Sequence, residues 1–170
     1  MIAAVAFRSG KNMGDENTME TDRPRRIYVD ADACPFKDVI LEIAAANGLA
    51  VTMVANYCHE IEDGDQIELV RVDRDPEAVD MVIANRATAG DIVVTQDYGL
   101  AALVLGKGVR ALSPRGKIYA VSEIEPLLDA RHRAQKARRA GARLKGPPRL
   151  GKSDRERFRR ALERVLSDEC

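Results

Sequence analysis

Short apolar segments alternate along this chain with longer segments whose apolar residues recur at helical spacing. The short segments predict strands of a buried parallel sheet, because such strands are apolar on both faces. They are residues 27–29, 49–56, 67–72, 91–97 and 109–112. The longer segments predict helices, since Pro or Gly residues stand at their ends. They are residues 34–48, 76–90 and 98–108. This order predicts an α/β fold: a mainly parallel central sheet with helices on both faces.

The last third of the chain has a different composition. Residues 121–141 predict a helix that becomes increasingly basic, and a Gly- and Pro-rich linker follows it. Residues 153–169 predict a further helix whose apolar stripe would pack against the rest of the protein.

These patterns divide the chain into three parts. Residues 1–24 are predicted to be a flexible N-terminal extension, and residues 25–130 to be the α/β domain. Residues 131–170 are predicted to be a basic segment, a Gly/Pro linker and a C-terminal helix that packs on the domain.

Composition narrows the class of protein only in part. The 170 residues include 27 Lys plus Arg and 27 Asp plus Glu, so the net charge indicates no partner. The three cysteines show neither metal-ligand spacing nor a disulfide framework, which is typical of reducing cytosol. No apolar run is long enough to cross a membrane. We therefore expect a cytoplasmic protein without a membrane partner, and the oligomeric state stays open.

Acidic residues stand where two of the predicted strands end. Asp30 ends the first strand, Asp32 follows two residues later, and Asp97 ends the fourth strand. Ligands of parallel sheets bind beyond the carboxyl ends of the strands, so we expect Asp30 and Asp97 to share one edge. Asp80 and Glu77, one turn apart on the intervening helix, add two further carboxylates.

This concentration of negative charge favours a cation site. Carboxylates that lie close together repel one another, and a hard divalent cation such as Mg²⁺ or Mn²⁺ removes that repulsion. Such a cation activates water and stabilises a phosphoryl group. The sequence therefore predicts a metal-dependent enzyme that hydrolyses phosphodiester bonds. Asp30, Asp80 and Asp97 are the candidate catalytic residues, and the same three with Asp32 are the candidate metal ligands.

Three polar residues are candidates for substrate binding. Asn56 ends the second predicted strand and Thr95 lies beside Asp97. Arg115 lies in the turn "SPRG" after the last strand, where a guanidinium could hold a phosphate. The basic residues between Arg131 and Arg160 could also contact a nucleic-acid backbone.

Each of these residues also has an ordinary structural interpretation. Asp32 could cap the helix that follows it, and Thr95 and Asp97 could form a turn. Asp80 and Arg115 could simply be solvated, and Asn56 could be a turn former. Cys34 is predicted to be a packed, unreactive thiol.

Several of these segments resemble a known family. The stretches "YVDADACP", "VAN", "GDIVVTQDYGLA" and "SPRG", with Asp80 between them, are similar to the YaiI/YqxD family of uncharacterised bacterial proteins. The resemblance implies a PIN-like fold, best known in metal-dependent ribonucleases, with Asp30, Asp80 and Asp97 in acidic-site positions and Asp32 nearby. With it, the predicted function becomes a metal-dependent nuclease that acts on RNA. The resemblance departs at residues 77–81, where "EAVDM" replaces the family pattern D-x-A-D-N but keeps Asp80.

Two other functions remain open from the sequence. An apolar run followed by D-x-D is typical of haloacid-dehalogenase-like phosphatases, in which Asp30 would be the nucleophile and Asp32 the acid/base. No lysine follows a predicted strand, as that chemistry requires. The other alternative is a non-catalytic module that binds nucleic acid or protein.

Overall fold

In a computed structural model of the protein, residues 23–56, 64–73, 75, 77–141 and 148–167 are described. They form one five-stranded parallel sheet with helices on both sides. The elements in chain order are β1 (Arg26–Asp30), α1 (Lys37–Ala46), β2 (Ala50–Ala55), β3 (Ile67–Arg71), α2 (Ala78–Arg86), β4 (Ile92–Val94), α3 (Tyr98–Leu105), β5 (Arg110–Leu112), α4 (Val121–Arg139) and α5 (Lys152–Ser167). The order predicted from the sequence, and with it the α/β class, is confirmed.

The sheet reverses its direction of winding between β1 and β4. Its strand order is β3-β2-β1-β4-β5, and every neighbouring pair is parallel. The chain builds outward from β1 to β3 and then returns to place β4 on the other side of β1. In such a sheet the connections leave β1 and β4 toward opposite faces, which opens a crevice at their carboxyl ends. Asp30 ends β1 at this edge, directly before the crevice.

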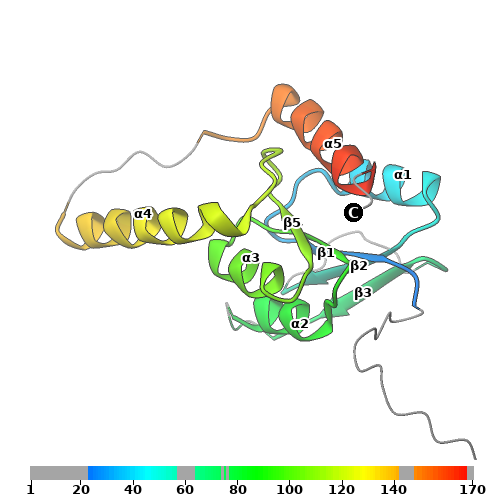
Figure 1. The fold of residues 1–170 in the computed structure, drawn as a ribbon, viewed down its shortest axis with the longest axis horizontal. Coiled ribbons are helices and arrows are strands. Elements are labelled where there is room, and N and C mark those ends of the chain that lie inside the picture. Colours follow the sequence, from blue (N-terminus) through cyan, green and yellow to red (C-terminus); the bar gives the residue numbers. More distant parts are fainter. Residues whose placement is uncertain (1–22, 57–63, 74, 76, 142–147, 168–170) are drawn as a thin grey trace, which may run out of the picture.

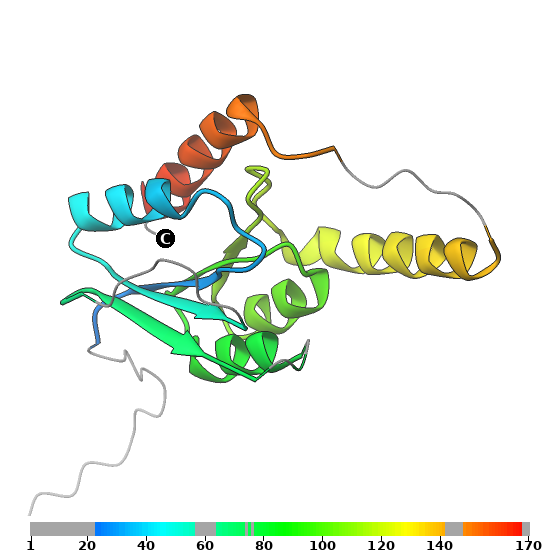
Figure 2. The same ribbon diagram turned by 180° about the vertical axis from the view of Figure 1, so that it is seen from behind.

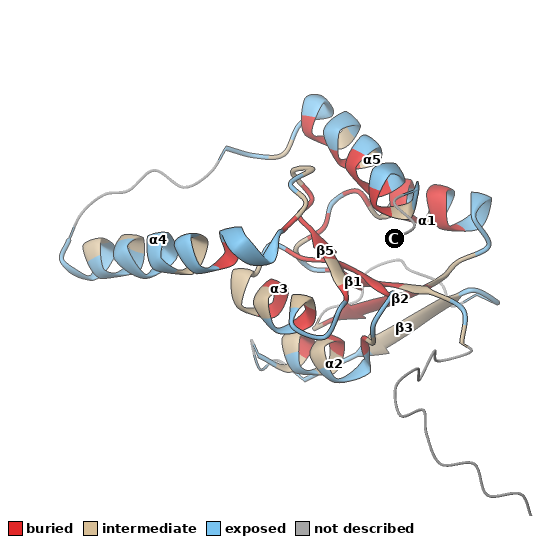
Figure 3. Cartoon of the chain, viewed as in Figure 1, coloured by how far each residue is buried: buried red, intermediate tan, exposed pale blue. Residues whose placement is uncertain are grey.

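Helices cover both faces of the sheet. Helices α1 and α5 lie over one face, whereas α2, α3 and the beginning of α4 lie over the other (Figures 1 and 2). Side chains alternate along β1: Ile27 and Val29 face α1 and α5, and Tyr28 faces the other layer. The strands at the centre are buried on both sides, which explains their continuous apolar runs (Figure 3).

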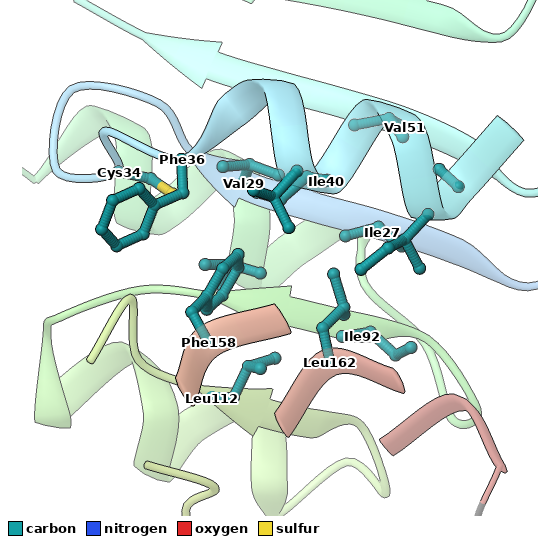
Figure 4. Packing of buried hydrophobic residues seen from close by; sticks show 14 of the residues in the cluster. Ile27, Val29, Cys34, Phe36, Ile40, Val51, Ile92, Leu112, Phe158 and Leu162 are labelled. Carbon is teal, nitrogen blue, oxygen red and sulfur yellow. The ribbon is translucent and has the colours of Figure 1, made fainter. Parts of the chain in front are cut away.

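Helix α5 packs beside α1 and covers the core on the same face of the sheet. Phe158 and Leu162 are fully buried and point toward Phe36 and the strands (Figure 4). The rings of Phe36 and Phe158 lie 5.9 Å apart between centroids. At the rim, Arg155 binds Asp38 and Arg159 binds Glu42, each through two hydrogen bonds. The packing predicted for the C-terminal helix is therefore present in the structure.

The first helix begins later than the sequence suggests. Helix α1 starts at Lys37, so Pro35 precedes it instead of lying in its first turn. Within the described residues no side chain caps α1, and the capping role considered for Asp32 is wrong. Residues 31–36 instead form a loop, of which Ala33 lines the pocket at the β1/β4 crevice.

Residues 1–22 of the predicted N-terminal extension lie outside the described residues. The division predicted between residues 130 and 131 falls inside α4, which is one continuous helix. Among the described helices, none is both long enough and apolar enough to cross a membrane.

Candidate active site

Asp30 and Asp97 line one pocket at the crevice between β1 and β4. The pocket has a volume of about 600 Å³, and Gln96 and Tyr98 also line it. Its other wall is α4, which contributes Arg131 and residues further along the helix. The parallel sheet thus brings together two carboxylates that are far apart in the sequence.

Asp97 is held in place by the start of α3. Its Oδ1 accepts hydrogen bonds from the backbone N–H groups of Gly99 (2.7 Å) and Leu100 (3.0 Å), so Asp97 is the N-cap of that helix. A Cβ atom on Gly99 would lie 2.9 Å from this oxygen, so the close approach requires glycine. Its Oδ2 accepts a hydrogen bond from Arg131 at 2.6 Å. Both oxygens are therefore engaged, and one of the three donors is a cation.

The pKa values of Asp30 and Asp97 shift in opposite directions. Burial raises the pKa of Asp30, and the negative charges of Asp32 and Asp97 add to the effect, although backbone hydrogen bonds from Ala33 and Asp32 oppose it. Burial also favours the neutral form of Asp97, but hydrogen bonds from Arg131 and the Leu100 amide outweigh it and lower its pKa. Asp97 is thus the firmly ionised member of the pair.

Asp80 lies in a second hollow, on the other side of the Asp97–Arg131 pair. This hollow has a volume of about 1000 Å³ and lies between α2 and α3. Both Asp97 and Arg131 line it as well. Burial raises the pKa of Asp80 to about 6, and the charges of Asp97 and Asp30 contribute to the shift. Asp80 therefore shares a hollow with Asp97 but not with Asp30, and its pKa responds to the charge of both.

The structure does not show the four-carboxylate metal cluster that the sequence predicted. In the described part of the chain, no three His, Cys, Asp or Glu side chains lie close enough to hold one metal ion together. Mg²⁺, however, keeps several of its waters in proteins and is commonly bound by one or two carboxylates together with substrate phosphates. Asp30 and Asp97 fit that mode of binding, in which Arg131 would have to leave Asp97.

Asp32 and Asn56 form a separate contact at the carboxyl ends of β1 and β2. The exposed side chain of Asp32 accepts a hydrogen bond from the backbone N–H of Asn56 at 2.7 Å. The Oδ1 atom of Asn56 is buried and has no hydrogen-bond partner in the structure as described. Asp32 thus ties β1 to β2, and Asn56 keeps one unused acceptor beside it.

Thr95 and Arg115 do not line either hollow. Thr95 is fully buried, and its Oγ1 accepts a hydrogen bond from the backbone N–H of Asp97 at 3.0 Å, which shapes the turn that presents Asp97. Arg115 donates to the backbone oxygen of Pro148 and lies 3.9 Å from Asp154 of α5. The "SPRG" turn also packs on α5, since a Cβ atom on Gly116 would lie 2.7 Å from the backbone of Arg157. The contacts of both residues are structural.

Cys34 is 2 % exposed and belongs to the core. Burial raises the pKa of its thiol to about 11, so the thiolate form of a nucleophile is not available at neutral pH. The prediction that Cys34 is a packed, unreactive residue agrees with this environment.

The sequence did not identify α4 as a wall of this site. Arg131, Ala134, Gln135 and Arg138 all line the pocket of Asp30 and Asp97. The last three follow Arg131 by three, four and seven residues, and residues at this spacing share one face of a helix. The sequence therefore contained a signal for a common face, but not for what that face meets. The basic composition of the segment is evident from the sequence, but the face that meets the carboxylates depends on the direction in which α4 leaves the domain.

Helix α2 gives a prediction about pH. The pKa of Asp80 is about 6 instead of its ordinary 3.8, so between these values the folded protein binds more protons than the unfolded chain. Stability therefore falls as pH rises through that window. Because Asp80 is partly solvated, we expect a loss of only about 1 kcal/mol. Asp80→Asn should remove the loss, so its melting temperature should exceed that of the wild type at pH about 8 but match it at pH about 4.

The control for this measurement is Glu125→Gln, which neutralises an exposed acid on α4. It should change the melting temperature little at either pH. A gain from Asp80→Asn of the same size at both pH values would contradict the raised pKa.

Fold and site together define an α/β protein whose parallel sheet holds an acidic pocket at the β1/β4 crevice. A family model described as "Uncharacterized BCR, YaiI/YqxD family" matches residues 28–168, and the chain belongs to that family. It is 46% identical over 142 residues to a UPF0178 protein of Halalkalibacterium halodurans, covering 84% of this chain and 90% of the relative. It is also 46% identical over 150 residues to a UPF0178 protein of Bacillus pumilus, covering 88% and 90%. No solved structure matches the chain.

Proposed function

We propose that this protein is a divalent-cation-dependent nuclease that hydrolyses phosphodiester bonds in RNA. The observation that carries the proposal is the meeting of Asp30 and Asp97 in one pocket at the β1/β4 crevice, within electrostatic reach of Asp80. The charge of Asp97 helps to raise the pKa of both Asp30 and Asp80, and a bound cation would relieve this repulsion. The PIN-like fold that the family resemblance implies, best known in metal-dependent ribonucleases, supports the same class of reaction.

Asp30 and Asp97 are the residues that would hold Mg²⁺ or Mn²⁺. Their carboxylates line the same pocket, and oxygen ligands suit these hard cations. When bound, the cation lowers the pKa of a coordinated water and stabilises the charge on a phosphoryl oxygen. Asp32, turned toward Asn56, would contribute only charge from a distance.

The chain's own groups would orient the reactants and handle the proton. Thr95 and the first turn of α3 fix the position of Asp97, so this ligand needs little reorganisation. Asp80, with a pKa of about 6, is ionised at neutral pH yet basic enough to accept a proton from an attacking water. Arg131 pairs with the carboxylate of Asp97, and a bound cation would take its place.

Removal of the metal tests this function. Purified protein should cleave a single-stranded RNA in the presence of Mg²⁺ or Mn²⁺, and excess EDTA should abolish the cleavage, since the water would lose its activating cation. Re-addition of Mn²⁺ should restore it, which distinguishes loss of the cation from unfolding. Equal cleavage in EDTA would exclude the metal-dependent mechanism, and binding of RNA without cleavage under any condition would identify a non-catalytic module.

A further inference from the structure

Helix α4 extends beyond the domain that supports it. Of its 19 residues only Ile124 is buried, with Leu127 and Leu128 partly buried beside the core. Beyond Leu128 the helix runs away from the sheet with mostly exposed side chains (Figures 1 and 3). The second half of α4 therefore contributes little to the core, and its side chains are available to a ligand.

One face of this second half is turned toward the acidic pocket. Arg131, Gln135 and Arg138 lie on that face, opposite Asp30 and Asp97. Arg131 is paired with Asp97, whereas Arg138 forms no ion pair with any described residue. The pocket thus has carboxylates on the sheet edge and hydrogen-bond donors on the helix.

A phosphodiester fits between two such walls. A cation on the carboxylates would bind one phosphate oxygen, and the donors of Gln135 and Arg138 would bind the others or the neighbouring phosphate. Guanidinium groups bind phosphate through charge-assisted, often bidentate hydrogen bonds. A volume of about 600 Å³ is in the range of pockets that hold small ligands, so one nucleotide unit can enter.

We propose that the face of α4 formed by Arg131, Gln135 and Arg138 is the phosphate-binding wall of an RNA site. This inference rests on the nuclease function, because it assigns the substrate's backbone to the same pocket. The wall would contact the phosphates of the RNA and not its bases. Its contribution to affinity would therefore depend on the salt concentration and not on the nucleotide sequence.

The test compares two arginines on opposite faces of α4. Arg138 lies on the proposed wall, whereas Arg133, five residues earlier and exposed, lies about 140° away on the helix and does not line the pocket. Binding of a fluorescently labelled oligouridylate is measured by anisotropy in Ca²⁺, over a range of salt concentrations. Arg138→Gln should weaken binding about tenfold and reduce the slope of log K against log salt by about 0.7. Arg133→Gln should weaken binding less than about twofold.

The conservative variant Arg138→Lys should keep most of the salt dependence, since it retains the charge. Equal weakening by Arg138→Gln and Arg133→Gln, or no weakening by either, would overturn the proposal. The result is separable from the nuclease function. If Arg138→Gln alone weakens binding but the wild-type protein cleaves no RNA in Mn²⁺, the phosphate-binding wall is retained and the nuclease function is rejected. If the wild-type protein cleaves RNA but both variants bind RNA equally well, the nuclease function is retained and the wall is rejected.

Discussion

Replacing Asp97 with asparagine is expected to lower metal-dependent RNA cleavage by at least about a hundredfold, because a bound cation supplies several kcal/mol to the transition state. Asparagine caps helices as well as aspartate does, so Asp97→Asn keeps the hydrogen bonds from Gly99 and Leu100. The substitution removes the negative charge of the carboxylate, which forms the ion pair with Arg131 and would bind the cation. The measurement is the initial rate of cleavage in Mn²⁺.

The matched control is Asp38→Asn, the same chemical change on α1, where the carboxylate pairs with Arg155 and lies outside the pocket lining. It should leave the rate unchanged. The melting temperature of Asp97→Asn should stay close to that of the wild type, which separates chemistry from folding. Undiminished cleavage by a well-folded Asp97→Asn protein would remove Asp97 from the reaction.

The largest effect on stability is expected from Phe158→Ala, which should lower the free energy of unfolding by about 3–5 kcal/mol. Phe158 is fully buried between α1 and the sheet, and its ring contacts that of Phe36. Its removal would leave a cavity that the close-packed strands cannot fill. Urea denaturation followed by circular dichroism measures the change.

Arg155→Ala is the comparison for this variant, because it removes an exposed ion pair from the same helix. Exposed pairs contribute about 0–1 kcal/mol, so its effect should be several times smaller. If Phe158→Ala unfolded at the same urea concentration as the wild type, α5 would not belong to the folded core.

The fold follows closely from the apolar pattern, since a strand covered on both faces has to be apolar throughout. The segments at residues 27–29 and 109–112 were found for that reason, and β1 and β5 lie there. The limits of helices are less clear from pattern alone. The apolar repeat and Pro35 suggested a start near residue 34, but residues 31–36 form a loop and α1 begins at Lys37.

The sequence predicts only those parts of the candidate site that lie at the ends of strands. Asp30 and Asp97 follow neighbouring parallel strands, and this geometry is sufficient to bring them to one pocket. The partner of Asp97 lies 34 residues further along the chain, on a helix whose direction no local pattern specifies. The contacts of Arg115 are likewise not evident from the sequence. Its position after β5 predicts a phosphate site, and in the structure its guanidinium donates to the backbone oxygen of Pro148, in the segment that leads into α5.

A cation between Asp30 and Asp97 can be detected directly by anomalous scattering from a crystal soaked in Mn²⁺. The expected result is a peak within coordination distance of both carboxylates, with Arg131 turned away from Asp97. A map with no peak at saturating Mn²⁺, and with Arg131 still bonded to Asp97, would contradict a metal site at this edge of the sheet.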